Sequence, residues 1–265
     1  IRKMARDDLP QVCAIAFQAF ANDELFNWLW PNSKNHPDDL RRYMIIRQRH
    51  RLVDVGTHGF VVLTEETDVD WTGKPEIAGY AFFEREGNDE LGRKWRTDSI
   101  FNSMGNGLVV CLEIERYLLS WELWYEDKFL DRAADRARMI QYDKAIGEEA
   151  FFTLDINWRL DVLAVSPKYQ RRGVGAMLLE HGQKIAASED LPMVTEASMD
   201  GRALYMKLGF KILGTTKIED SVDDVIMLWE PRHLEGSWLE EQGDGGVRFK
   251  TNPEKLEEVG SKLTP

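Results

Sequence analysis

The pattern of apolar and polar positions divides the chain into strand-like and helix-like stretches. Short β-rich runs predict seven strands, at 1–4, 59–64, 77–83, 152–165, 192–198, 210–214 and 225–229. Apolar residues at helical spacing predict helices, at 7–20, 37–53, 111–125, 133–146 and 174–188. Strands that alternate with helices in this way predict an α/β fold with a mixed central sheet and helices on both of its faces.

The stretch between the third and fourth predicted strands is helical and long, so we interpret 88–150 as an insertion. One face of its longer helix carries Cys111, Ile114, Leu118, Trp121 and Tyr125, and we expect that face to be buried against the body. We assign residues 1–232 to one domain. Residues 233–265 are polar and glycine-rich, which favours a C-terminal tail.

Composition limits the class of protein. The 265 residues are 43% apolar, enough to bury a core without disulfides or metals. Cys13 and Cys111 form no C-x-x-C pair, no apolar run approaches the ~20 residues of a membrane helix, and no signal-type apolar segment follows the start. We therefore expect a cytoplasmic protein that is not embedded in a membrane.

The charge and the histidines narrow the choice of ligand. A net charge of −12 argues against nucleic acid or an acidic membrane surface as partner and suits a cationic or neutral one, although the same charge can serve solubility alone. The five histidines show no metal-ligand spacing such as H-E-x-x-H, so we expect no metal site.

The most informative motif runs from Leu163 to Ala176. An apolar strand ends at a Ser-Pro pair, a short basic loop follows, and Gly173 and Gly175 stand where a helix begins. Glycines let a backbone approach an anion closely, and the first N–H groups of a helix are free to bind one. Leu178 stands where a dinucleotide fingerprint needs its third glycine, and no Gly-Lys-Ser/Thr triplet of a P-loop follows, so both nucleotide interpretations fail.

The surviving pattern, Gln170-Arg171-Arg172-Gly173-Val174-Gly175 after a Leu-Ala-Val strand, resembles motif A of the GNAT N-acetyltransferase superfamily. The resemblance implies that this loop binds the pyrophosphate of acetyl-coenzyme A (acetyl-CoA). It also implies a sheet splayed between its fourth and fifth strands, with the pantetheine arm in the gap, along Leu163 and Val165.

A second segment, 198–210, is similar to motif B of the same superfamily, in which a short helix ends in a Tyr-x-x-x-Gly-Phe turn. The resemblance implies that the Tyr205 hydroxyl faces the coenzyme sulfur and protonates the departing thiolate; a buried structural tyrosine is the alternative. The cofactor-binding residues implied are Leu163, Ala164, Val165, Gln170, Arg171, Arg172, Gly173, Val174, Gly175, Ala176, Ser198, Gly201, Leu204, Tyr205 and Lys207.

Asp161 is an acid within an apolar strand, which favours a functional role. Alternation places it on one face with Arg159, Leu163 and Val165, and burial there would raise its pKa toward the range of a general base. Such a base would take a proton from the attacking amine. An internal ion pair with Arg159 or a surface arginine is the competing interpretation. By resemblance, Glu196 is the second candidate base.

Two groups of aromatic residues are candidates for the acceptor pocket. The resemblance implies that the stretch with Phe26, Trp28 and Trp30 shapes this pocket, and we expect Trp121 and Tyr125 in the insertion to contribute apolar contact area and a face for a cationic amine. The alternatives are that Phe26, Trp28 and Trp30 fill the core, and that Trp121 and Tyr125 pack the insertion against the rest of the domain.

Together the motifs predict a GNAT enzyme that moves an acetyl group from acetyl-CoA to a primary amine of a small molecule, by direct attack in a ternary complex. A protein or peptide acetyltransferase, acting on lysine or an N-terminus, and a catalytically silent CoA-binding module are the alternatives. We expect a monomer or a homodimer.

Overall fold

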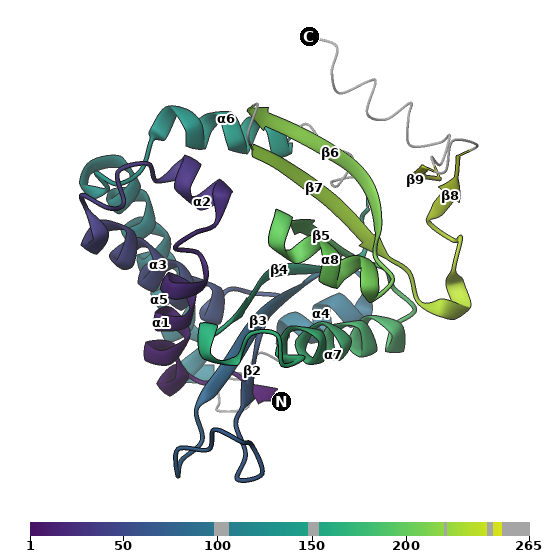
Figure 1. Cartoon of the computed structure of the whole chain (residues 1–265), viewed down its shortest axis with the longest axis horizontal. Helices are drawn as coiled ribbons and strands as arrows, with labels where there is room; N and C mark the ends of the chain where they lie inside the picture. The colour runs from purple at the N-terminus through teal and green to yellow at the C-terminus, as the bar shows by residue number, and fades with distance from the viewer. Residues whose placement is uncertain (98–105, 148–153, 220–221, 243–245, 251–265) are drawn as a thin grey trace.

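A seven-stranded sheet organises the computed structural model, which describes residues 1–97, 106–147, 154–219, 222–242 and 246–250 (Figure 1). Its strands are β1 Arg2–Lys3, β2 Thr57–Leu63, β3 Ile77–Glu86, β4 Asn157–Val165, β5 Met193–Ala197, β6 Lys211–Glu219 and β7 Val222–Trp229. Their order is β1-β2-β3-β4-β5-β7-β6; β4 and β5 run parallel, and the other neighbours are antiparallel. The predicted mixed sheet is confirmed.

The parallel pair separates along its length. Within the described strands, β4 pairs with β5 only from Trp158, opposite Met193, to Leu160, opposite Thr195. Beyond that point β4 stays paired with β3 and β5 stays paired with β7. We call Leu160 and Thr195 the vertex, residues 161–165 the β4 arm and residues 196–197 the β5 arm. The predicted splay between the fourth and fifth strands is therefore present.

A β-bulge at Asp161 lies directly beyond the vertex. Leu160 is opposite Phe83 and Val162 is opposite Phe82, so β4 has one residue more than β3 at this point. An extra residue in one strand bends it and reverses which face the following side chains occupy. The bulge thus marks the place where β4 leaves β5.

The predicted alternation along β4 is wrong beyond this point, because it assumed a regular strand. Leu160 packs in the same cluster as Leu163 and Val165, whereas Val162 and Ala164 pack in the cluster on the opposite face. One unpaired residue accounts for the change.

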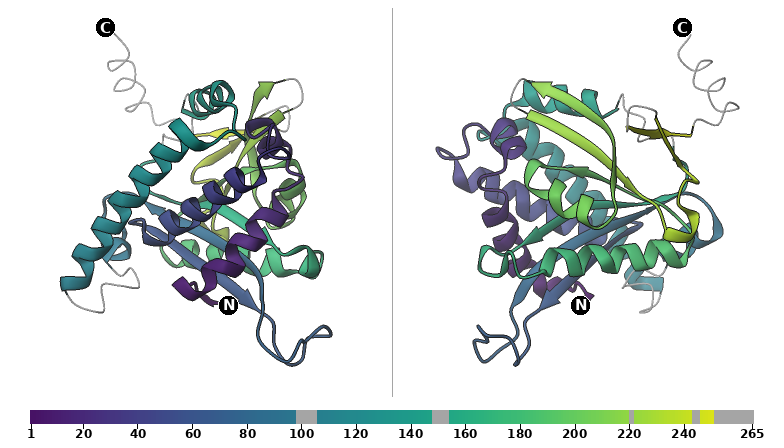
Figure 2. Two further views of the ribbon diagram at one scale, coloured as in Figure 1. Left: turned by 90° about the vertical axis from the view of Figure 1, so that its left-hand side faces the viewer. Right: turned by 45° about the vertical axis from the view of Figure 1, so that its right-hand side comes forward.

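Helices cover both faces of the sheet (Figure 2). On one face lie α1 Leu9–Ala19, α2 Glu24–Leu29, α3 Pro37–Val53 and α6 Arg136–Gly147. On the other lie α4 Glu90–Thr97, α7 Val174–Ser188 and α8 Met199–Lys207. In α7, Gly182 allows a close approach to the sheet, because a Cβ there would lie 2.2 Å from the Phe83 ring.

The long helix of the insertion, α5 Asn106–Tyr125, packs on α3 by a different face from the one predicted. Leu119 is 1% exposed, whereas Leu118 is 57% and Trp121 is 55% exposed. The expectation of a buried Ile114–Leu118–Trp121–Tyr125 face is therefore wrong, because all four side chains are exposed. The side chain of Cys111 lies outside the described residues.

Polar contacts explain this choice of face. Glu126, at the start of the π-helical turn Glu126–Leu130 that follows α5, accepts a hydrogen bond from Arg42 at 2.6 Å. His50 and Ser120 are hydrogen-bonded at 2.9 Å, and Arg6 pairs with Glu115. Helix α5 is thus held largely by charged and polar partners, which a search for apolar periodicity does not detect.

After β7 the structure describes residues 230–242 and 246–250. Strands β8 Leu239–Glu241 and β9 Val247–Phe249 form a two-stranded sheet, and Leu239 packs with residues of β5 and β7. The Glu230 carboxylate accepts hydrogen bonds from the backbone N–H groups of Gly236, Trp238 and Leu239. The rest of the predicted tail, 251–265, lies outside the described residues, as do 152–153 of the predicted fourth strand.

Candidate active site

The loop 170–173, which we call the diphosphate loop after the ligand that the resemblance implies, leads into α7 beside the place where β4 and β5 separate. The first backbone N–H groups of α7 are free there. Gly173 has φ +87° and precedes α7, whose start has no side-chain cap. The amides of Val174, Gly175 and Ala176 are in the first helical turn, where no intrahelical acceptor exists. A Cβ at Gly173 would meet nothing within 4 Å, so the surface in front of these amides is open. An anion fits there.

The predicted pantetheine side of the site lies next to this helix start. Leu163 and Val165 of the β4 arm and Leu204 of α8 surround Gly175; a Cβ on Gly175 would lie 3.1 Å from Leu204 and 3.7 Å from the other two. Gln170 donates to the carbonyl oxygen of Val165 at 3.3 Å, which closes the loop onto the end of β4. Ala164 points the other way and is buried.

The N-terminal part of α8 forms the opposite wall. Ser198 is the N-cap residue of α8, and Gly201 lies against the Tyr205 ring, 2.8 Å from where its Cβ would be. Lys207 is exposed in the last turn. The structure therefore brings the motif A and motif B residues to one end of the sheet, although no contact assigns Lys207 a ligand.

Tyr205 is buried at the vertex. Its hydroxyl hydrogen-bonds to Thr195, whose Oγ1 lies 3.2 Å from the carbonyl oxygen of Leu160. Burial raises the pKa of the Tyr205 phenol to about 12, although the bond to Thr195 acts in the opposite direction. The phenol therefore stays protonated at neutral pH and remains a hydrogen-bond donor.

Asp161 and Arg51 of α3 form a bidentate ion pair. Arg51 Nε lies 2.5 Å from Oδ2 and a terminal guanidinium nitrogen lies 3.3 Å from Oδ1. Burial raises the pKa of Asp161, but the charge and hydrogen bonds of Arg51, with the charges of Arg47 and Arg159, outweigh it and lower the pKa below its usual value. The expectation of a raised pKa is wrong, because the sequence did not reveal this arginine.

Glu196 holds the equivalent place on the other arm. It directly follows the vertex residue Thr195, as Asp161 follows Leu160. The Tyr142 hydroxyl of α6 donates to Glu196 Oε2 at 3.1 Å, and the Glu196 side chain is partly exposed. The two candidate bases therefore flank the vertex, one on each arm.

The predicted aromatic residues fall into two separate groups. Trp28 and Trp30 are 7% and 4% exposed and belong to the core, and Phe26 stacks on Trp30 at a centroid distance of 5.0 Å. Trp121 and Tyr125 stack on each other at 5.6 Å on the exposed face of α5. No ring contact among the described residues joins the groups, so the structure does not bring all five together.

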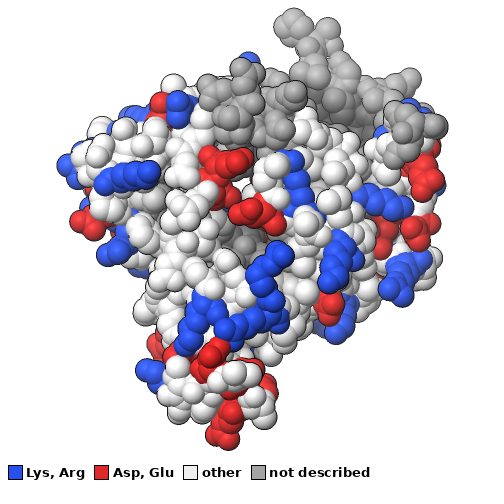
Figure 3. Space-filling view, viewed as in Figure 1, with Lys and Arg blue, Asp and Glu red and all other residues white. Residues whose placement is uncertain are grey.

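Charges of opposite sign flank the opening (Figure 3). The diphosphate loop and the turn before it carry Lys168, Arg171 and Arg172. Across the opening, Asp23 caps α2, and the charge of Asp200, in the first turn of α8, contributes to its environment. Burial of Asp23, with Asp200 and a neighbouring glutamate, raises the pKa of its carboxyl group.

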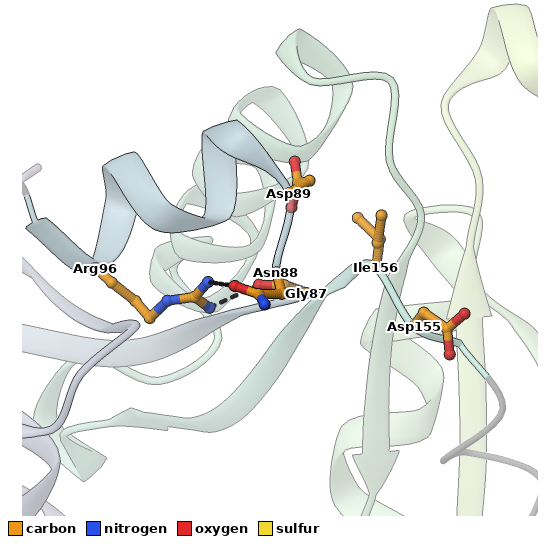
Figure 4. Close-up of a pocket in the computed structure, with 6 residues that line it drawn as sticks. All are labelled: Gly87, Asn88, Asp89, Arg96, Asp155 and Ile156. Carbon is orange, nitrogen blue, oxygen red and sulfur yellow. Dashed lines mark hydrogen bonds between the residues drawn. The ribbon is translucent and has the colours of Figure 1, made fainter.

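An open pocket at the other end of β4 is separate from this site (Figure 4). Arg96 lies across it and donates to the carbonyl oxygen of Gly87 at 2.6 Å and to Asn88 at 3.3 Å. Asp155 and Ile156, just before β4, complete its wall together with Asp89. None of the predicted site residues lines this pocket.

Neither a membrane span nor a metal cluster is found in the part of the chain that the structure describes. No helix there combines the length and apolarity needed to cross a bilayer, and no group of three or more His, Cys, Asp and Glu side chains is arranged to hold a metal ion.

Comparison with known proteins supports the interpretation of the motifs. The model of the acetyltransferase (GNAT) domain matches residues 133–212, which contain β4, the diphosphate loop, α7, β5 and α8. This part of the chain is therefore similar to the GNAT acetyltransferase domain. An acetyltransferase of Stachybotrys chartarum is 24% identical to this chain over 224 residues, 84% of the chain and 85% of the relative.

Two further relatives are more distant or match a shorter part. The peptidyl-lysine N-acetyltransferase YjaB of Salmonella typhimurium is 28% identical over 92 residues, 35% of this chain and 60% of the relative. The histone acetyltransferase HPA2 and related acetyltransferase structure from Corynebacterium glutamicum aligns with a TM-score of 0.50 and 23% identity, over 87% of this chain and 94% of its own. That alignment shows the shared fold.

The residues at the splay fit acetyl-CoA as acyl donor. The free amides of Gly173 to Ala176 suit its diphosphate, and the β4 arm has no partner strand on its β5 side within the described residues. These groups were predicted from the sequence, but the contacts of Arg51, Thr195 and Tyr142 were not. Arg51 is one of several arginines on α3, and nothing in its spacing marks it as the partner of Asp161.

Proposed function

We propose that this chain transfers the acetyl group of acetyl-CoA to a primary amine of a small molecule. The observation that carries the proposal is the splay that opens beside the free amides at the start of α7. An acetylated pantetheine arm lying along the β4 arm would bring its thioester to the vertex, between the two candidate bases. A cationic amine is favoured by the acidic side chains of Asp23 and Asp200 across the opening.

Glu196 is the better-supported general base. Asp161 is engaged in two hydrogen bonds to Arg51 and its pKa is lowered, both of which weaken it as a proton acceptor. Glu196 accepts a hydrogen bond from the Tyr142 hydroxyl and is partly exposed on the β5 arm. In this proposal Glu196 takes the proton of the attacking ammonium, directly or through water, and Asp161 holds Arg51 in place between α3 and β4.

Tyr205 supports the departure of the coenzyme sulfur as a hydrogen-bond donor. A thiol has an ordinary pKa of roughly 8.5, so complete proton transfer from a phenol with a pKa of about 12 is unfavourable. A hydrogen bond that strengthens as charge develops on sulfur needs no such transfer. We therefore assign Tyr205 to stabilisation of the leaving group, while solvent completes its protonation.

Replacement of Gly173 tests the binding part of the proposal. Gly173→Ala places a methyl group at a left-handed residue in front of the free amides, and Gly236→Ala is its control, because Gly236 has φ +82° and a Cβ there would meet only the Leu239 carbonyl oxygen, at 4.0 Å, in the segment after β7. Both variants lose about 1 kcal/mol of stability from backbone strain. We expect Gly173→Ala alone to weaken coenzyme A binding, by roughly tenfold in calorimetry.

A thiol-release assay tests the choice of acceptor. Wild-type protein, acetyl-CoA and a panel of small amines and lysine peptides should give coenzyme A release that depends on a small amine. Release with peptides alone would favour the protein-acetyltransferase alternative. The relative YjaB is named as an enzyme of that kind, a peptidyl-lysine N-acetyltransferase. Coenzyme binding without release on any acceptor would favour a silent module.

A further inference from the structure

The loop between β2 and β3 holds the diphosphate loop from outside. Glu76, the residue before β3, accepts a hydrogen bond from the Tyr169 hydroxyl at 2.7 Å and from Lys168 Nζ at 2.9 Å, both on its Oε2. These two residues belong to the 3₁₀ turn Pro167–Tyr169, which immediately precedes Gln170. One carboxylate therefore binds the segment from which the diphosphate loop starts.

Glu76 is itself fixed in the hairpin. Its backbone N–H donates to Thr64 Oγ1 at 2.9 Å, and the Thr64 N–H donates to the Glu76 carbonyl oxygen at 2.9 Å. Thr72, within the same loop, donates to Glu76 Oε1 at 2.7 Å. The backbone of Glu76 is thus fixed by Thr64, whereas Thr72 contacts the carboxylate oxygen that does not bind the turn.

The partners of Glu76 are coupled to the diphosphate loop. The Tyr169 ring is 5% exposed and packs in the core under the Arg172 guanidinium, whose carbon lies 5.7 Å from the ring centroid. Arg172 pairs with Asp70 of the same β2–β3 loop. Movement of the Tyr169 hydroxyl would therefore shift the backbone that leads to Gly173.

Of the three basic side chains in this segment, two are paired with acids and the third has no ion pair among the described residues. Lys168 and Arg172 are each paired with an acid of the β2–β3 loop, whereas Arg171 makes no ion pair with any residue that the structure describes. Arg171 has φ +61°, so its backbone is held in a conformation that non-glycine residues rarely adopt. An outside restraint on this loop gives a physical reason why such a conformation persists.

We propose that Glu76 is a positioning residue for coenzyme A, acting through Tyr169 and Lys168 on the backbone of residues 170–173. The inference rests on the proposed assignment of this loop to the diphosphate. Its consequence is that part of donor affinity is set by a hairpin loop outside the segment 133–212 that matches the domain model. The hydrogen bonds from Lys168, Thr72 and Tyr169 lower the pKa of Glu76 to about 2, so the carboxylate stays charged throughout the neutral range.

Four variants separate positioning from general stability. Glu76→Ala removes every contact, Tyr169→Phe removes one hydrogen bond and keeps the buried ring, and Glu76→Gln keeps an oxygen that accepts from Tyr169. Thr72→Val is the matched control, since it removes a hydrogen bond to the same carboxylate but leaves the turn untouched. The dissociation constant of coenzyme A is measured by calorimetry for each variant, together with its melting temperature.

We expect Glu76→Ala to weaken coenzyme A binding roughly tenfold, Tyr169→Phe several-fold, and Glu76→Gln and Thr72→Val less than threefold. With an acceptor from the amine panel, KM for acetyl-CoA should rise in the first two variants while kcat at saturation stays within about twofold. Tyr169→Phe carries the test if Glu76→Ala does not fold, because its apolar packing is kept.

Two results would overturn the inference. One is wild-type affinity in both Glu76→Ala and Tyr169→Phe; the other is equal weakening by Tyr169→Phe and Thr72→Val. A wild-type protein that itself gives no heat with coenzyme A would instead overturn the assignment of the diphosphate loop, so the two failures are distinguishable.

Discussion

At the scale of single residues, the vertex separates two carboxylates that look alike in the sequence. Asp161 and Glu196 each follow the last paired residue of their strand, yet one is bound by an arginine and the other by a tyrosine hydroxyl. The charged partner lowers the pKa of Asp161 and draws its oxygens toward α3. The two acids therefore have different environments although they occupy equivalent positions on the two arms.

Glu196→Gln and Asp161→Asn should have different effects. We expect Glu196→Gln to lower kcat for an amine acceptor by about a hundredfold, the usual worth of a general base, with little change in coenzyme binding or stability. Asp161→Asn should leave Arg51 unpaired and lower the free energy of unfolding by about 3 kcal/mol. Steady-state kinetics and urea unfolding measure the two effects.

The pH dependence of stability gives an independent check on Asp161. Its pKa is depressed in the folded state, so its contribution is present above the unfolded value of roughly 3.9 and is lost as the pH falls through the folded value. Asp161→Asn should remove that acid-side loss. The assignment of the base would be contradicted if Asp161→Asn reduced kcat more than Glu196→Gln while the protein stayed folded.

The local backbone of the diphosphate loop could be predicted from the sequence, because the left-handed Gly173 and the start of α7 depend on adjacent residues. Its assignment as an anion site stays a prediction. The ion pair of Asp161 joins residues 110 apart, and the bulge that reorients the β4 arm leaves no mark in an apolar run. Both need the register with β3 and α3, which pattern alone does not supply.

At the scale of elements, boundaries set by strong local signals were predicted correctly. Helix α3 runs from Pro37 to Val53 and α7 ends at Ser188, as expected from proline at a helix start and from apolar spacing. Helix α5 was predicted as a helix, but its buried face was predicted wrongly. Helix α3 contacts Ser120 of α5 through His50 and Glu126 of the following turn through Arg42, and the predicted apolar stripe is exposed.

Two adjacent leucines in α5 test which face is buried. Leu119→Ala should lower the free energy of unfolding by about 2–4 kcal/mol, because the truncation leaves a cavity against α3. Leu118→Ala removes the same atoms from an exposed position and should change it by less than about 0.5 kcal/mol. Urea denaturation followed by circular dichroism compares them. Equal losses would mean that both faces are covered.

At the scale of the whole molecule, the splay means that the ligand should contribute to stability. A donor bound across both arms would link the β1–β4 half of the sheet to the β5–β7 half, which the described residues of β4 and β5 join by three residue pairs. Binding to the folded state at a hundredfold excess over the dissociation constant adds about 2.7 kcal/mol.

Thermal unfolding measures this linkage. We expect coenzyme A to raise the melting temperature of the wild-type protein by about 5 °C or more, and to raise that of Gly173→Ala much less at the same concentration. Adenine nucleotides that lack the pantetheine arm should give a smaller increase. An equal increase with those nucleotides would place binding outside the wedge between the arms.

The position of the vertex along the chain also affects how substitutions can change the specificity of this protein during evolution. Helices α1, α2 and α3 precede β4 in the chain, whereas the diphosphate loop, α7 and α8 follow the vertex residue Leu160. On the proposed function, substitutions in α1 and α2 would alter which amine is accepted and leave the loop that binds the donor unchanged. Glu76 also precedes β4 but contacts the turn before the diphosphate loop, so a substitution there would change the affinity for the donor.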